Sequence, residues 1–181
     1  MRSYKQLSHS GKLRRLHSLA ISGLAHYDLP DPKIESHCFE TNLLYRVTAH
    51  SGERFIFRLA SPGCRSYQDL LSEAMWLPAL EHETDIPVPG IIPNRSGGTV
   101  LSLMVPGISQ AWHMTLMRWL PGRLLGHYLN ESNLEKMGAL FAGLHQHAGA
   151  WTPPKGFTTR RFIHWLSRGE KNLIIQDVEN R

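Results

Sequence analysis

The sequence contains little that would mark it as a secreted or membrane protein. Its 181 residues include two cysteines, Cys38 and Cys64, too few for a disulfide framework or a zinc knuckle. No apolar run approaches the ~20 residues of a membrane-spanning helix. The first twenty residues are basic and lack the apolar segment of a secretory signal. We therefore expect a cytoplasmic protein with reduced cysteines and no membrane partner.

Common catalytic motifs are also missing. There is no Gly-x-Ser-x-Gly, Walker loop or Cys-x-x-Cys, so hydrolase, P-loop and redox functions have no motif support. Eleven histidines raise the question of a metal site. His145 and His147 stand two positions apart, which on a helix places them on different faces, unlike the i, i+4 pair of a zinc helix. We predict no metal site, and regard both as helix-end histidines that are incidental to the chemistry.

The net charge of +5 is concentrated at the two ends of the chain. Residues 1–33 carry six Lys/Arg against two Asp/Glu, and residues 155–181 carry six against three. Residues 34–154 carry eight against ten, a net −2. Basic ends are more often solvated faces than a nucleic-acid footprint, so we predict no nucleic-acid partner.

Hydrophobic periodicity predicts an α+β fold. We expect a helix over residues 12–26, a hairpin of strands 42–48 and 54–60, and strands over 99–105 and 114–120. Between the strand pairs, a helix begins near Ser66 with Asp69 as its capping partner, and Pro78 should end or kink it. A last helix begins at the capping box Ser132–Glu135, and its expected buried stripe is Leu134, Met137, Phe141, Leu144 and Ala148. Strands grouped in this way do not alternate with helices as in a parallel α/β sheet.

Arg58 and Glu73 are the most informative pair of charges. Arg58 alternates away from Phe57 and Leu59 near the end of a strand, and Glu73 falls on the apolar stripe of the next helix. A carboxylate on a buried stripe requires a cationic partner or a raised pKa, and Arg58 is the nearest candidate in sequence. A purely structural salt bridge, or a Glu at the edge of a solvent-facing stripe, remains the alternative to a functional pair.

A strand cation paired with a carboxylate on the following helix is also how kinases position ATP phosphates. With other stretches the pattern resembles the aminoglycoside phosphotransferase family, which includes small-molecule kinases with a protein-kinase-like fold. The stretches are "FETNLLYRVTAHSGERFIFRLASPGCRSYQDLLSEAMWLPALEHETDIPVP", "LMRWLPGR" and "MGALFAGLHQHAGAWTPP". In order and spacing they cover roughly residues 20 to 160.

This resemblance implies an ATP site and a division of the chain. Residues 39–42, ending at Asn42, would be the phosphate-covering turn, Arg58 would stand in the place of the strand Lys, and Glu73 would be its partner. Residues 117–120, including Met117, Arg118 and Trp119, would form the hinge whose backbone binds adenine, although Trp119 fits packing equally well. Residues 1–116 would be the nucleotide-binding lobe, 117–123 the hinge, and 124–181 the start of an incomplete helical lobe.

The chain departs from the family pattern in ways that bear on activity. The turn at residues 39–42 has no glycine, which puts a cradle of bare backbone amides in doubt. Family members carry a His-x-Asp loop, an Asn and a second Asp that supply the base and the magnesium ligands after the last helix. Here Asp177 is the only aspartate past residue 148, and no His-x-Asp follows. His26-Tyr27-Asp28 has that spacing but precedes the strands, so we predict a structural role for it.

Two functions from different classes remain open at this point. One is an ATP-dependent, magnesium-dependent phosphotransferase acting on a small-molecule hydroxyl, present as a fragment that lacks the catalytic loop and is inactive alone. The alternative is a non-catalytic module, a degenerate kinase lobe that binds a nucleotide or a partner. A fragment would leave the stripe of its last helix uncovered, so we also expect self-association.

Overall fold

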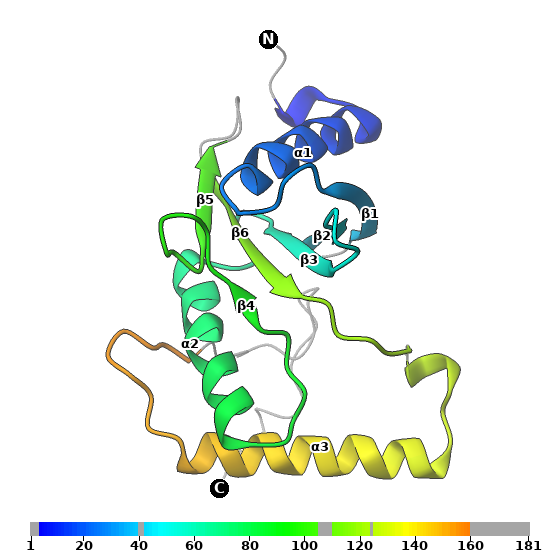
Figure 1. The fold of residues 1–181 in the computed structure, drawn as a ribbon, viewed down its shortest axis with the longest axis vertical. Coiled ribbons are helices and arrows are strands. Elements are labelled where there is room, and N and C mark those ends of the chain that lie inside the picture. The colour runs from blue at the N-terminus through cyan, green and yellow to red at the C-terminus, as the bar shows by residue number, and fades with distance from the viewer. Residues whose placement is uncertain (1–3, 40–41, 105–109, 124, 160–181) are drawn as a thin grey trace, which may run out of the picture.

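The computed structural model describes residues 4–39, 42–104, 110–123 and 125–159, and these form an α+β fold on one antiparallel sheet (Figure 1). The predicted fold class is confirmed. The helices are α1 (His9–Leu24), α2 (Tyr67–Glu83) and α3 (Glu131–Ala150), with short 3-10 turns η1 (Tyr4–Gln6) and η2 (Leu125–His127). The strands are β1 (Lys33–Phe39), β2 (Asn42–Thr48), β3 (Arg54–Ala60), β4 (Ile91–Ile92), β5 (Leu101–Met104) and β6 (Ala111–Arg118).

Within the described residues, the strands β1-β2-β3-β6 lie in that order, and the far edge of β6 pairs with both β4 and β5. The predicted hairpin is present, with Tyr45 opposite Phe57. Strand β6 starts three residues earlier and ends two residues earlier than predicted, so Trp119 and Leu120 lie beyond the sheet. Strands β1 and β4 were not predicted, because neither has a strong alternating pattern of its own.

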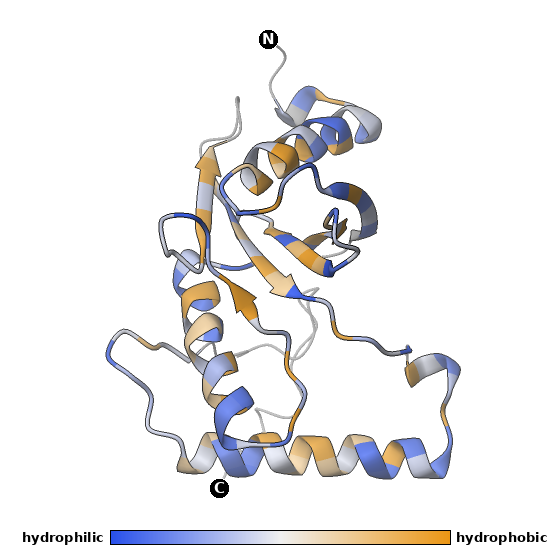
Figure 2. Ribbon diagram, viewed as in Figure 1, coloured by the Kyte–Doolittle hydropathy of each residue, from blue (hydrophilic) through white to orange (hydrophobic). Residues whose placement is uncertain are grey.

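One face of the sheet carries the main core and is covered by α1 (Figure 1). Alternate residues of the central strands point to this face, and they pack on the inward stripe of α1. The buried strand residues are Leu43, Tyr45, Val47, Phe55, Phe57, Leu59, Trp112, Met114 and Leu116, and those of α1 are Leu16, Leu19, Ala20 and Leu24. The hydropathy colouring shows an apolar inner side and a polar outer side on α1 (Figure 2).

Gly23 allows α1 to approach the sheet closely. A Cβ at this position would lie 2.7 Å from Met114 Sδ and 2.9 Å from Phe57 Cζ. Real Cβ atoms do not approach their neighbours so closely, so a side chain here would force either α1 or the side chains of Met114 and Phe57 to shift. Tyr27, which follows α1, completes this contact edge-on to Phe57, with ring centroids 5.8 Å apart.

Helix α2 lies against the opposite face and begins with the predicted capping box. Ser66 Oγ accepts from the backbone N–H of Asp69, and Asp69 accepts from the N–H of Ser66. Of the two predicted effects of Pro78, a stop or a kink, the stop is wrong, because the helix continues to Glu83. Leu77 and Leu80, on either side of Pro78, are buried, and this packing offsets the missing backbone hydrogen bond.

Helix α3 differs most from prediction. Its N-cap is Asn130, which accepts from the N–H of Asn133, and not Ser132. The stripe predicted to be buried is largely open: Leu134 is 46% and Phe141 51% exposed. The prediction that this stripe is buried is therefore wrong. Among the described residues of α3, His147 alone is buried.

Candidate nucleotide-binding site

The predicted pairing of Arg58 and Glu73 is confirmed. Strand β3 directs Arg58 to the face opposite the α1 core, and α2 presents Glu73 to the same face. Arg58 Nη1 lies 3.0 Å from Glu73 Oε1, and Arg58 Nη2 lies 2.8 Å from Glu73 Oε2. This is the two-pronged geometry that suits a guanidinium and a carboxylate. The Arg58 side chain is 8% exposed and that of Glu73 26%.

Thr115 on β6 completes the environment of Arg58. It stands directly opposite Arg58 in the sheet, and its Oγ1 accepts from Arg58 Nε at 3.1 Å. Each of the three guanidinium nitrogens of Arg58 therefore donates a hydrogen bond. These bonds matter because the site is buried, where an unpaired charge is costly. Sequence reasoning missed Thr115, although a polar residue inside the apolar run of a central strand was a usable signal.

A second cation, Arg65, reaches the same carboxylate. Its Nη1 lies 3.3 Å from Glu73 Oε2, and its side chain is 34% exposed. Two guanidinium groups on one carboxylate leave a net charge of +1 at this point. Because Arg65 makes a longer and more exposed contact than Arg58, it can exchange Glu73 for another anion at lower cost.

The strand register sets an apolar wall beside the ion pair. Leu44 stands opposite Arg58, and Ile56 stands opposite Met117, so alternation puts all four on one face. Leu44 and Ile56 are partly exposed, whereas Met117 is buried. The arrangement places an apolar surface next to a cationic one.

The hinge backbone after β6 is partly committed to the protein itself. The N–H of Arg118 donates to Gly90 O at 2.8 Å, and the N–H of Trp119 donates to Arg54 O at 3.1 Å. The N–H of Leu120 makes no hydrogen bond with any described residue. Of these three backbone N–H groups, those of Arg118 and Trp119 are therefore already bonded within the described part of the chain.

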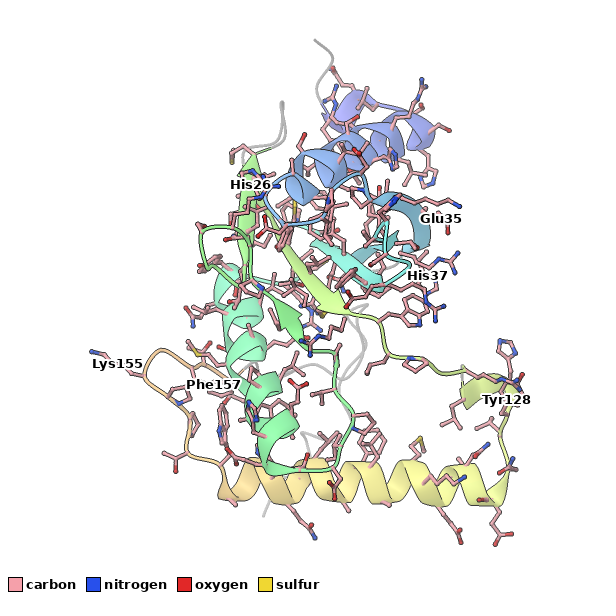
Figure 3. The ribbon with its side chains drawn as sticks, viewed as in Figure 1. His26, Glu35, His37, Tyr128, Lys155 and Phe157 are labelled. Carbon is pink, nitrogen blue, oxygen red and sulfur yellow. The ribbon has the colours of Figure 1, made fainter. Side chains whose placement is uncertain are left out.

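The Trp119 side chain packs on strands at the edge of the site. Arg54 lies over its ring at 5.4 Å, and the His37 ring meets it edge-on at 5.5 Å. In Figure 3, His37 projects from the part of β1 nearest the hinge. These contacts agree with the packing role that the sequence left open, and they place the indole between β1 and β3.

Asn42 is the first residue of β2 and pairs with Ala60. Alternation places it on the same face as Arg58, at a diagonal position in the register. Residues 40–41 of the expected phosphate-covering turn lie outside the described residues.

Across the sheet from Ala60, His113 shares a hydrogen bond of 2.8 Å with Ser102, and burial lowers the pKa of its imidazole.

The remaining sequence candidates lie elsewhere. Tyr27 is buried in the α1 core, and Asp28 pairs with Arg95 at 2.8 Å, which agrees with the structural role predicted for this segment. His145 is exposed. His147 lies in the last turn of α3 as predicted, and it is also buried and bonded to α2 through Trp76.

No group of three or more His, Cys, Asp or Glu side chains suited to a metal ion occurs among the described residues. Within the described part of the chain, the site therefore contains no magnesium ligand set of this kind. No helix in the described part of the chain is long and apolar enough to cross a membrane.

The antiparallel sheet, with the Arg58–Glu73 pair between β3 and α2, has a kinase-like arrangement, and comparison with known proteins gives the family. The family model described as "Phosphotransferase enzyme family" matches residues 40–176, more than half of the chain. The protein belongs to this family. No curated protein matches.

Two solved structures support the kinase-like assignment. A microcompartment-associated aminopropanol kinase is 26% identical with a TM-score of 0.70, over 82% of this chain and 45% of its own. The amicoumacin kinase hAmiN, solved with AMP-PNP, Ca2+ and Ami, is 16% identical with a TM-score of 0.67, over 90% of this chain and 48% of its own. The described fold is thus that of the N-terminal lobe of a kinase-like protein, and the chain spans less than half the length of either relative.

Proposed function

We propose that this chain binds ATP as the nucleotide-binding half of a small-molecule phosphotransferase. The observation that carries the proposal is the buried Arg58, held by Glu73 and Thr115 on the face of the sheet opposite α1. All three residues fall within the region that the family model matches. The guanidinium donors that Glu73 and Thr115 do not use would bind phosphate oxygens, and Arg65 would add charge beside them.

The adenine would lie on the apolar wall of Leu44 and Ile56. Its polar edge would meet the hinge through the N–H of Leu120 and the carbonyl of Arg118. Met117 would close the inner end of the pocket, and Asn42 would lie near the phosphates. Trp119 would shape the pocket from outside by holding β1 and β3 to the hinge.

The proposed division of the chain follows from this site. Residues 1–116 would form the nucleotide-binding lobe, residues 117–123 the hinge, and residues 124–181 the start of a helical lobe. In the reaction typical of kinases, a hydroxyl oxygen of the acceptor bonds to the γ-phosphorus, and the bond to the bridging oxygen breaks to release ADP. The hydroxyl proton passes to a carboxylate base.

Magnesium would enter as the Mg-ATP complex, neutralising charge on the phosphates. The sequence has no His-x-Asp past residue 148, so we propose that a polypeptide of these residues binds nucleotide without transferring phosphate. The acceptor would be a small molecule with a hydroxyl group.

Thermal unfolding with and without Mg-ATP, together with an ADP-release assay, tests this function. We expect Mg-ATP to raise the melting temperature slightly, with ADP release at background over a panel of small alcohols and aminoglycosides. Robust phosphorylation of any of these alcohols by the polypeptide alone would overturn the proposal of binding without transfer. Absence of any Mg-ATP effect at saturating nucleotide would overturn the nucleotide site itself.

A further inference from the structure

A continuous segment after α3 runs back along α2, the helix that carries Glu73 (Figure 1). The N–H of Thr158 donates to Ser72 Oγ at 2.9 Å, and the Gln68 amide donates to the carbonyl of Gly156. The labelled Phe157 lies beside α2 in Figure 3. The end of α3 and the segment after it therefore pack on one side of α2, and the sheet packs on its other side.

His147 joins α3 to α2 through both of its ring nitrogens. Trp76 Nε1 donates to His147 Nδ1 at 3.0 Å, and His147 Nε2 lies 3.1 Å from Glu83 Oε2. The indole nitrogen is a donor only, so Nδ1 carries no proton. The ring proton then lies on Nε2, which donates a hydrogen bond to the Glu83 carboxylate. The His147 side chain is 5% exposed.

Aromatic packing fixes the plane of this imidazole. Trp151 stacks on it, with ring centroids 6.1 Å apart and planes 26° from parallel. Phe157 meets Trp151 edge-on at 5.0 Å. With its plane and both nitrogens set, His147 makes directed contacts with α2 as well as filling space between the helices.

Trp76 stands one helical turn after Glu73, so a shift of α2 at Trp76 moves Glu73 as well. We propose that His147 is a positioning residue, which fixes α2 through Trp76 and Glu83 and thereby holds Glu73 against Arg58. His147 does not touch the nucleotide site; it acts through the helix. The effect on nucleotide affinity rests on the function proposed above, whereas the link between His147 and the ion pair does not.

The first measurement is ATP affinity of the full chain, by isothermal titration in the presence of magnesium. Trp76→Phe and His147→Gln each remove the Trp76–Nδ1 hydrogen bond, and loss of one such bond, about 1 kcal/mol, corresponds to about fivefold weaker binding. His147→Asn keeps an acceptor near the position of Nδ1, so it should bind ATP more tightly than His147→Gln. His145→Gln, an exposed change two residues away on the same helix, is the matched control and should match the wild type.

The second measurement requires no nucleotide. Glu73 and His147 make no direct contact, so the losses of stability from Glu73→Gln and His147→Gln should add unless α2 links them. We expect urea unfolding of the double variant to show a smaller loss than the sum of the two single variants. Glu73→Gln combined with His145→Gln should give a simple sum.

The outcomes separate this inference from the proposed function. If His147→Gln binds ATP as tightly as the wild type, or if its loss of stability adds fully to that of Glu73→Gln, the positioning role is wrong. If the wild type itself binds no ATP, the proposed function fails. In that case the unfolding comparison alone decides whether His147 acts on the ion pair.

Discussion

Breaking the Arg58–Glu73 pair from its two ends should have unequal consequences for stability. Glu73→Leu leaves Arg58, which is 7% exposed, with Thr115 as its remaining partner. Leaving one charge of a buried pair alone costs about 3–5 kcal/mol. The Glu73 side chain is 26% exposed, so water reaches this end of the pair and lowers the cost. We expect Glu73→Leu to lower the free energy of unfolding by about 2–3 kcal/mol.

Arg58→Met should cost less. It leaves Glu73 with Arg65, which already lies 3.3 Å from Oε2 and is partly exposed, so the carboxylate keeps a counter-charge. We expect a loss of about 1–2 kcal/mol. The double variant replaces both charges with apolar groups of similar size, and such replacements are often neutral. The coupling between the two sites should therefore be about 2 kcal/mol or more.

Urea unfolding of the four proteins, followed by circular dichroism, measures this cycle. Asp28→Ala is a control, since it breaks the exposed Arg95–Asp28 pair and should cost no more than about 1 kcal/mol. The reasoning is refuted if Glu73→Leu costs no more than Asp28→Ala, or if Arg58→Met proves the more damaging of the two single changes.

Three further changes test other parts of the structure. Gly23→Ala gains up to about 1 kcal/mol of helix propensity but brings a Cβ 2.7 Å from Met114 Sδ. Because overpacking of this kind costs about 1–3 kcal/mol, we expect the variant to unfold at a lower urea concentration than the wild type. A higher urea midpoint would contradict the close packing of α1 on the sheet. Burial raises the pKa of Tyr27 and Tyr45 from 10.0 to about 12, so their contribution to stability is complete below about pH 10 and is lost as pH rises towards 12. Absorbance at 295 nm should show that these two tyrosines ionise at a higher pH than the others. A single titration near pH 10 in the folded protein would contradict this. Leu134→Glu and Phe141→Glu replace exposed side chains of α3, so sedimentation should show less self-association with an unchanged melting temperature, and a lowered melting temperature would mean that the stripe is buried after all.

The ion pair could be predicted from sequence because two independent patterns pointed to it. Strand alternation turned Arg58 away from the core, and helical spacing put Glu73 on an inward stripe. Both are local periodicities, and the structure brings the two together. Arg65 carried no such signal, because it lies in a loop just before α2 and its contact with Glu73 depends on how that loop folds.

Predictions failed where long-range packing overrides local pattern. Pro78 stops an isolated helix, but α2 is held on both sides and continues past it. The α3 stripe has helical periodicity, yet periodicity alone does not say whether a partner covers it. His147 illustrates the same limit, since its spacing from His145 suggested nothing, and its partners Trp76 and Glu83 come from another helix.

The most direct test of the account is an equilibrium titration of the full chain with Mg-ATP, comparing the wild type with Arg58→Ala. Loss of hydrogen bonds from a charged group costs about 1.5–3 kcal/mol, so Arg58→Ala should weaken binding by about 10- to 100-fold. Arg58→Lys keeps a cation, so its affinity for ATP should lie between those of the wild type and Arg58→Ala. It serves as the second variant if Arg58→Ala does not fold. Arg14→Ala, on the exposed side of α1, should bind ATP like the wild type. If Arg58→Ala and Arg14→Ala bind ATP equally well, Arg58 does not hold the phosphates and the central claim is wrong.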